Sequence, residues 1–188
     1  MTRLEESPMK IVLLNDATLP VYRSELAQLL TDAVANGASL GYDTQIDHYD
    51  AECYFHSLRP LIAKGELLLW IARDEHRVIG TVQLSLCQKP NGRNRAEIQK
   101  LMVHSSARRL GVAHQLITTL EKSAMQAHRG LLYLDTQAGS AAEAFYRTEG
   151  YRCMGEIPDY ACTPDGQYHP TAIYYKRLFA VAQPAKAS

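Results

Sequence analysis

Hydrophobic positions recur along the chain with two different periods, and each change of period marks the border of an expected element. Apolar runs rich in branched residues predict strands at 10–14, 67–72, 78–87, 96–103, 131–134, 151–157 and 171–178. Apolar residues at helical spacing predict helices over about 20–35, 46–64, 112–129 and 141–149. A glycine follows each helix closely and accepts the backbone angles that end one.

The order of these elements predicts the fold class. One strand precedes two helices and three strands, and then come a helix, a strand, a helix and two strands. This order indicates a mixed α/β (α+β) protein with a central, mostly antiparallel mixed sheet flanked by helices. A doubly wound nucleotide-binding fold would alternate strand and helix strictly, which this chain does not. We expect a single domain over residues 1–188, with frayed ends at 1–8 and 180–188.

Composition and charge narrow the class of partner. The 188 residues are 46% hydrophobic and 21% charged, and the formal net charge is zero. Such a chain can bury an ordinary core, and it has no excess charge to attract nucleic acid or an anionic membrane. The four cysteines lack metal-ligand spacing, and no apolar run suits a signal peptide or a bilayer span. We therefore expect a cytoplasmic monomer or homodimer with no metal, nucleic-acid or membrane partner.

The stretch Arg108–Ala113 lies between a predicted strand and a predicted helix. Gly111 and Ala113 are small, so backbone N–H groups can approach an anion closely. The helix that follows adds unpaired N–H groups and the positive end of its dipole. Together these features favour a phosphate or pyrophosphate group. By itself the pattern also fits an ordinary helix start that contains a glycine.

Two motifs in this order resemble the GCN5-related N-acetyltransferase (GNAT) superfamily. The first is Arg-x-x-Gly-x-Ala after the strand Ile98–Val103, and the second is the helix end Phe145–Tyr151. The resemblance implies the acyl-CoA N-acyltransferase fold and acetyl-CoA (coenzyme A) as the cofactor. It implies a cofactor site formed by Leu101, Met102, Val103, Arg108, Arg109, Leu110, Gly111, Val112, Ala113, Gly139, Ala142 and Tyr146. Gly139 replaces an asparagine found in many members, so that side chain's hydrogen bond is missing.

The resemblance also nominates catalytic groups. Glu97 corresponds to an acidic strand residue that serves as general base, and Asp135 is the second candidate for that role. Tyr146 corresponds to a tyrosine that protonates the leaving thiolate. Each has a plainer interpretation: Glu97 could pair with Arg95 or Lys100, Asp135 could cap the turn before the next helix, and Tyr146 could be a core residue.

The acceptor site is expected between the first two helices and the late loop. We nominate Ser39, Gly41, Tyr42, Lys100 and Tyr160, and the partner of an acceptor carboxylate stays open among Arg93, Arg95 and Lys100. The stretches 83–103, 129–146 and 163–174 resemble a superfamily member that acetylates the antibiotic tabtoxinine-β-lactam. An amino-acid-like amine or hydroxyl acceptor, and hence antibiotic resistance, is therefore expected. Another small amine, or a non-catalytic acyl-CoA sensor, remains the alternative.

Overall fold

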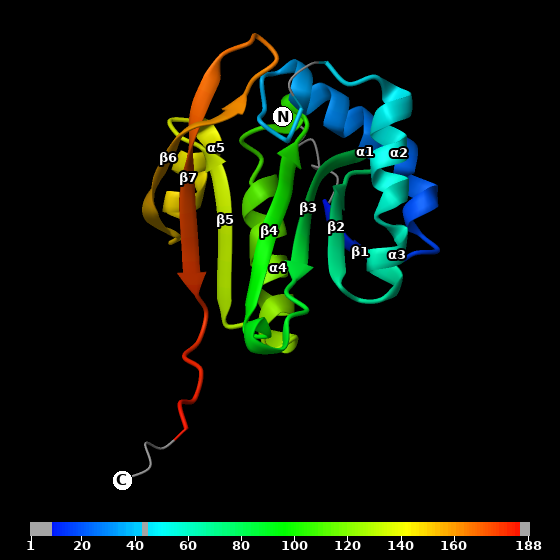
Figure 1. The fold of residues 1–188 in the computed structure, drawn as a ribbon. Coiled ribbons are helices and arrows are strands. Elements are labelled where there is room, and N and C mark those ends of the chain that lie inside the picture. The colour runs from blue at the N-terminus through cyan, green and yellow to red at the C-terminus, as the bar shows by residue number, and fades with distance from the viewer. Residues whose placement is uncertain (1–8, 43–44, 185–188) are drawn as a thin grey trace, which may run out of the picture.

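A single seven-stranded sheet organises the structure, a computed structural model that describes residues 9–42 and 45–184 (Figure 1). The strands follow the spatial order β1-β2-β3-β4-β5-β7-β6. All neighbours are antiparallel except β4 and β5, which are parallel. The elements are β1 (Lys10–Leu14), α1 (Leu19–Ala35), α2 (His48–Ser57), α3 (Arg59–Ala63), β2 (Leu67–Arg73), β3 (Val78–Leu86), η1 (Pro90–Gly92), β4 (Arg95–Val103), η2 (Ser105–Ala107), α4 (Val112–Gln126), β5 (Leu131–Gln137), α5 (Ala141–Thr148), β6 (Arg152–Cys162) and β7 (Tyr168–Arg177).

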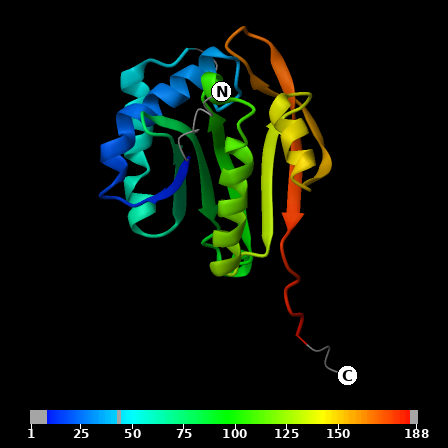
Figure 2. The same ribbon diagram turned by 180° about the vertical axis from the view of Figure 1, so that it is seen from behind.

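The two faces of the sheet carry separate cores. Successive side chains in a strand point to opposite faces, so Trp70 packs in the cluster with α4 and α5, whereas Leu69 and Ile71 pack with α1 and α2. Seen from behind, α4 runs along the sheet (Figure 2). The predicted fold class, a mostly antiparallel mixed sheet flanked by helices, is confirmed.

Strands β4 and β5 pair only over a short stretch, and this positions the candidate site. Their parallel ladder covers Arg95, Ala96 and Glu97 of β4 and ends there. Beyond Glu97, β4 continues to Val103 with only β3 as a partner. The backbone groups of this part of β4 that face β5 are therefore left out of the ladder. The parallel strands separate at their carboxyl ends.

The prediction of one continuous helix over 46–64 is wrong, because two helices occupy this stretch. It begins at His48, because the Asp47 side chain accepts a hydrogen bond from the Asp50 N–H at 2.7 Å and caps the first turn. It breaks at Leu58, which ends α2 and begins α3. Pro60 occupies the first turn of α3, where its missing N–H costs nothing; inside a continuous helix it would remove a hydrogen bond.

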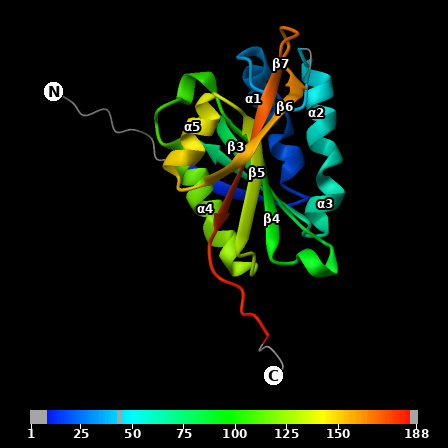
Figure 3. The ribbon, with the colours of Figure 1, turned by 60° about the vertical axis from the view of Figure 1, so that its left-hand side comes forward.

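Three late strands are longer than predicted. β5 extends to Gln137 instead of Leu134, β6 extends to Cys162, and β7 begins at Tyr168. Pairing continues because the β6–β7 turn is closed by its own side chains, with Gln167 N–H donating to Asp165. The resulting hairpin rises at the same end of the molecule as the loop after α1 (Figures 1 and 3). The expected frayed ends 1–8 and 185–188 lie outside the described residues, and 180–184 form no regular element.

Candidate active site

The turn before α4 has the geometry of an anion cradle. Gly111 has φ +74°, and a Cβ built on it meets no atom within 4 Å, so the space above the backbone is open. Arg109 also has positive φ, at +65°. α4 begins at Val112 with no side-chain cap and no acidic residue in its first turn. Among the described residues, nothing therefore competes for the first N–H groups of this helix, and the turn fits a pyrophosphate.

The turn is anchored to α1 through Asp32. One Asp32 carboxylate oxygen accepts the backbone N–H of Ser105 at 2.9 Å, and the other accepts the Ser105 hydroxyl at 2.7 Å. The His104 ring lies 3.7 Å from the same carboxylate. Burial alone would raise the pKa of Asp32, but these hydrogen bonds outweigh burial and leave the pKa lowered. The ionised carboxylate thus ties the segment before the cradle to the helix that leads to the acceptor loop.

The sheet separates the catalytic candidates into two groups. Glu97 lies opposite Ser85 in β3 and Tyr133 in β5, so these side chains share one face. Asp135, two residues after Tyr133, shares that face as well. Tyr146 belongs to the cluster on the other face, with α4 and α5. The charge of Asp135 nevertheless acts on the Tyr146 hydroxyl, so the two groups approach each other beyond the last β4–β5 pair.

Glu97 has the environment of a base. It is half-buried, and burial raises the pKa of its carboxyl; the charge of Asp135 raises it further, while a hydrogen bond from Gln99 acts in the opposite direction. A carboxyl with a raised pKa accepts a proton more readily near neutral pH. Within the described residues, Glu97 forms no ion pair with Arg95 or Lys100. The plainer interpretation of Glu97 is therefore wrong.

Asp135 lies inside β5 and does not cap a helix. It is paired opposite Ile173 of β7, and its carboxylate accepts the Thr171 hydroxyl at 3.2 Å. The cap of α5 is Ser140, whose side chain accepts the Glu143 N–H at 3.2 Å. The interpretation of Asp135 as a cap is therefore also wrong, because β5 continues past residue 134. The two carboxylates, Glu97 and Asp135, interact electrostatically on one face.

Tyr146 is buried, with 5% of its surface exposed, and its ring packs edge-on against Phe145 and Tyr151 at centroid distances of 5.4 and 5.5 Å. Burial, helped by the charge of Asp135, raises the pKa of its hydroxyl, so the proton stays on it at neutral pH. No described residue forms a hydrogen bond with that hydroxyl. Its core interpretation is thus correct for the ring, and the hydroxyl keeps a proton it can donate. Two further cofactor nominees lie at the start of the same helix: Gly139, with φ +76°, directly precedes the cap Ser140, and Ala142 is exposed in the first turn.

The acceptor nominees are only partly brought together. Gly41 approaches Lys100, because a Cβ on Gly41 would stand 3.5 Å from the ammonium nitrogen. Tyr42 places its ring centroid 5.9 Å from the same atom. Ser39 is half-buried in the same loop, and Tyr160 is 52% exposed on the β6–β7 hairpin. The structure therefore groups Gly41, Tyr42 and Lys100.

Two residues of this group escaped the sequence analysis. The ring of Tyr54, from α2, lies 5.6 Å from the Lys100 ammonium, and its hydroxyl is hydrogen-bonded to the side-chain amide of Gln83 at 3.1 Å. Burial raises the pKa of Tyr54 to about 12. Gln83 is 1% exposed in the middle of β3. A glutamine on a strand with apolar residues on both sides was the available signal, because a buried amide needs a polar partner.

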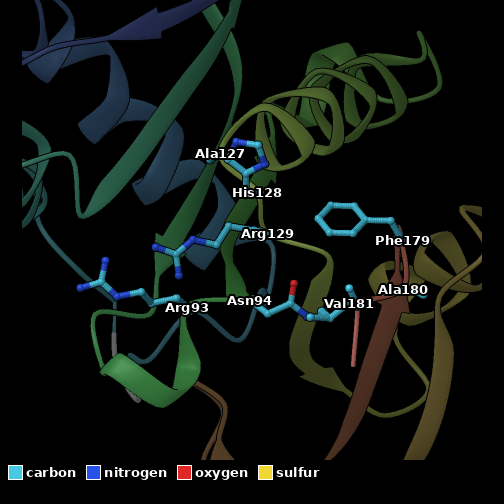
Figure 4. A pocket seen from close by; sticks show the side chains of 9 residues that line it. Arg93, Asn94, Ala127, His128, Arg129, Phe179, Ala180 and Val181 are labelled. Atoms are coloured by element: carbon cyan, nitrogen blue, oxygen red, sulfur yellow. The ribbon is translucent and has the colours of Figure 1, made fainter. Parts of the chain in front are cut away.

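A cavity of about 460 Å³ lies at the other end of β4 and β5 and is separate from this site (Figure 4). It is lined by residues just before each strand, Arg93 and Arg129 among them, and by 179–182 after β7. Arg93 is thereby distant in the fold from the acceptor loop. In the described part of the chain no group of three metal-ligating side chains occurs. No described helix has both the length and the apolar character to cross a bilayer.

Comparison with known proteins identifies the family of this chain. The model of the acetyltransferase (GNAT) family matches residues 31–151, which include the cradle, Glu97, Asp135 and Tyr146. The chain belongs to the GNAT acetyltransferase family. It is an acyl-CoA-dependent N-acetyltransferase, and acetyl-CoA is its cofactor.

Solved structures share the fold of this acetyltransferase across nearly its whole length. A ribosomal-protein-alanine N-acetyltransferase from Brucella melitensis is similar with a TM-score of 0.72 and 22% identity, over 90% of this chain and 99% of that one. A Salmonella typhimurium protein solved with acetyl-CoA has a TM-score of 0.74 and 15% identity, over 96% and 100%. A provisionally assigned phosphinothricin N-acetyltransferase has a TM-score of 0.70 and 15% identity, over 92% and 100%. At these identities the likeness concerns the fold.

Proposed function

We propose that this acetyltransferase acetylates the amine of a small, amino-acid-like acceptor, tabtoxinine-β-lactam or a close analogue, and so confers resistance to that antibiotic. The observation that carries the proposal is the acidic pair Glu97 and Asp135, beside the gap between β4 and β5 and opposite Tyr146. Two carboxylates can divide the binding of an ammonium group from the removal of its proton.

Resemblance narrows the acceptor. The stretches 83–103, 129–146 and 163–174 resemble the tabtoxin resistance protein, and they include loops that a shared fold does not demand. The loop 89–94 contains η1, and 163–167 forms the β6–β7 turn, at the same end of the sheet as the loop after α1. The name of one structure of the same fold indicates phosphinothricin as its acceptor, which makes that compound the obvious competitor in a panel.

The residues of this chain divide the work as follows in the proposal. The cradle Arg108–Ala113 binds the pyrophosphate through backbone N–H groups, and the free edge of Leu101–Val103 orients the acyl end and polarises its carbonyl. Glu97 takes the proton of the acceptor ammonium at a carboxylate oxygen, directly or through water, and Asp135 holds that ammonium. Tyr146, on the opposite face, would give its hydroxyl proton to the departing thiolate. Bound acetyl-CoA supplies an activated acetyl thioester.

The test is an acceptor panel followed by the release of free coenzyme A. Tabtoxinine-β-lactam is offered beside phosphinothricin, amino acids and polyamines. Cys53 and Cys153 are exposed and would react with a thiol reagent, so each assay needs a blank with protein and acetyl-CoA but without acceptor. Mass spectrometry of the product confirms the acetylated amine independently.

Turnover that is at least about tenfold faster with the β-lactam than with every other acceptor supports the proposal. Preference for a polyamine or another amine would refute the acceptor while leaving the family activity intact. Acetyl-CoA that binds but is never consumed would favour the sensor alternative and refute catalysis on these acceptors.

A further inference from the structure

Lys100 occupies an unusual place in β4. Its φ is +52°, which a residue with a side chain rarely adopts, and the β3–β4 register shifts around it: Thr81 pairs with Met102, whereas Gln83 pairs with Gln99. This is a β-bulge, in which an extra residue interrupts the alternation of side chains. The bulge brings Lys100 to the face that carries Gln83, whereas strict alternation from Gln99 would place it on the other.

The ammonium group of Lys100 is held by a carbonyl and two aromatic rings. It donates to the backbone carbonyl of Leu40, and it lies 5.9 and 5.6 Å from the ring centroids of Tyr42 and Tyr54. These contacts attract a cation without neutralising it. No carboxylate of the described residues lies within ion-pair distance of Lys100. Asp135 acts on this charge electrostatically, but from beyond ion-pair distance. A half-buried ammonium in this setting can bind the carboxylate of a ligand.

The opposite charge lies on the same face. Glu97 precedes Lys100 by three residues in β4, about 10 Å along an extended strand before the bulge shortens it. Asp135 lies beside Glu97 on β5. The acidic pair and the Lys100 ammonium thus lie on one face, beside the part of β4 that has no β5 partner. A zwitterionic molecule, with an ammonium at one end and a carboxylate at the other, complements this arrangement.

The other two candidate partners of an acceptor carboxylate, Arg93 and Arg95, are less suited to that role. Arg93 lines the cavity at the far end of β4 (Figure 4). Arg95 is the first residue of β4, and its guanidinium packs against the turn at Gly92. Of the three, only Lys100 lies against the loop after α1.

We propose that Lys100 binds the carboxylate of the acceptor, and that Tyr42 and Tyr54 hold the Lys100 ammonium in place. This inference rests on the proposed function and deepens it, because it makes the acceptors amino acids in the strict sense. Amines without a carboxylate become poor substrates. The competing interpretation is that Lys100 only tethers the loop through Leu40.

The experiment compares matched acceptors. Each amino acid that the wild type acetylates is paired with its own carboxamide, which keeps the amine and removes the negative charge. The ratio of kcat/KM within each pair is measured for the wild type, Lys100→Met, Lys100→Arg and the control Lys122→Met. Lys122 is exposed on α4, away from the acceptor loop. Acetyl-CoA binding by calorimetry checks that each variant is folded.

In Lys100→Met, kcat/KM for the amino acid should fall about 10- to 100-fold, the effect of losing a charged hydrogen bond, and that for the carboxamide should change by less than about threefold. Lys100→Arg keeps the charge and should keep most of the preference. Lys122→Met should match the wild type.

An equal loss for both members of the pair would identify a tether and overturn the proposal. An unchanged ratio in Lys100→Met, with amino acids still turned over, would overturn it while leaving the proposed function standing. A wild type that acetylates no carboxylate-bearing acceptor would overturn both. If Lys100→Met failed to bind acetyl-CoA, the ratio in Lys100→Arg would decide, and loss of the preference there would overturn the proposal.

Discussion

Replacing Gly80 by alanine tests how the cofactor cradle is supported. Gly80 lies in β3 directly under the start of α4, and a Cβ there would stand 2.7 Å from Val112 Cγ1, 3.1 Å from Leu116 Cδ1 and 3.2 Å from the Met102 carbonyl oxygen. Carbon atoms pack favourably at about 3.5–4.0 Å. The first turn of α4 would therefore have to move by about 1 Å, and it carries the N–H groups that we propose bind the pyrophosphate.

The size of the effect follows from this clash. Overpacking of this kind costs about 1–3 kcal/mol, and the entropy gained by replacing a glycine offsets about 0.4–1 kcal/mol of it. Gly80→Ala should thus lose about 1–2 kcal/mol in the free energy of unfolding. Acetyl-CoA should bind about tenfold more weakly, because the N–H groups of α4 are displaced.

Two measurements check this prediction. Urea unfolding can be followed by the fluorescence of Trp70, the only tryptophan, which is buried in the same cluster as Val112. Calorimetry measures the Kd of acetyl-CoA. In the double variant Gly80→Ala/Val112→Ala the closest clashing atom is gone, so affinity should recover relative to Gly80→Ala, with Val112→Ala alone as the control. Wild-type affinity and stability in Gly80→Ala, or no recovery in the double variant, would refute the reasoning.

Four further changes test the site. Glu97→Gln should lower kcat about 100-fold or more and flatten the acidic limb of the pH profile, and an unchanged kcat would exclude the base role. Because the pKa of Glu97 is raised, the folded wild type binds more protons than the unfolded chain and loses stability as pH rises through that pKa. The variant lacks this group, so it should gain stability relative to the wild type over the same pH range. Gly111→Val should weaken acetyl-CoA at least about tenfold by strain and by filling the cradle, and an unaltered Kd would disprove the cradle. Tyr146→Phe should slow kcat about 10- to 100-fold with stability kept within about 1 kcal/mol, whereas a normal rate would make Tyr146 a packing residue only. Asp32→Asn should raise the KM for acetyl-CoA several-fold, and an unchanged KM would show that the anchor is dispensable.

Much of the fold, and the position of the turn before α4, could be predicted from the sequence. Strands and helices follow from the period of apolar residues. The turn and helix start follow from Arg108–Ala113 at the border of a strand and a helix, because these signals are local. The positions where a helix is interrupted were harder to predict. Leu58 and Pro60 divide the helix predicted over 46–64, and the choice between a kink and two helices depends on what the segment packs against.

Only the tertiary structure decided how the group around Lys100 is assembled. Leu40 and Lys100 are 60 residues apart, and their contact depends on the bulge in β4 and on the end of β4–β5 pairing at Glu97. No local pattern announces a bulge at a lysine, since its positive φ is a strain that surrounding contacts hold. The sequence alone thus determines which chemical groups are available. Which of them meet was determined by long-range pairing, because backbone hydrogen bonds between strands and burial across the sheet outweigh the local preference of a single residue.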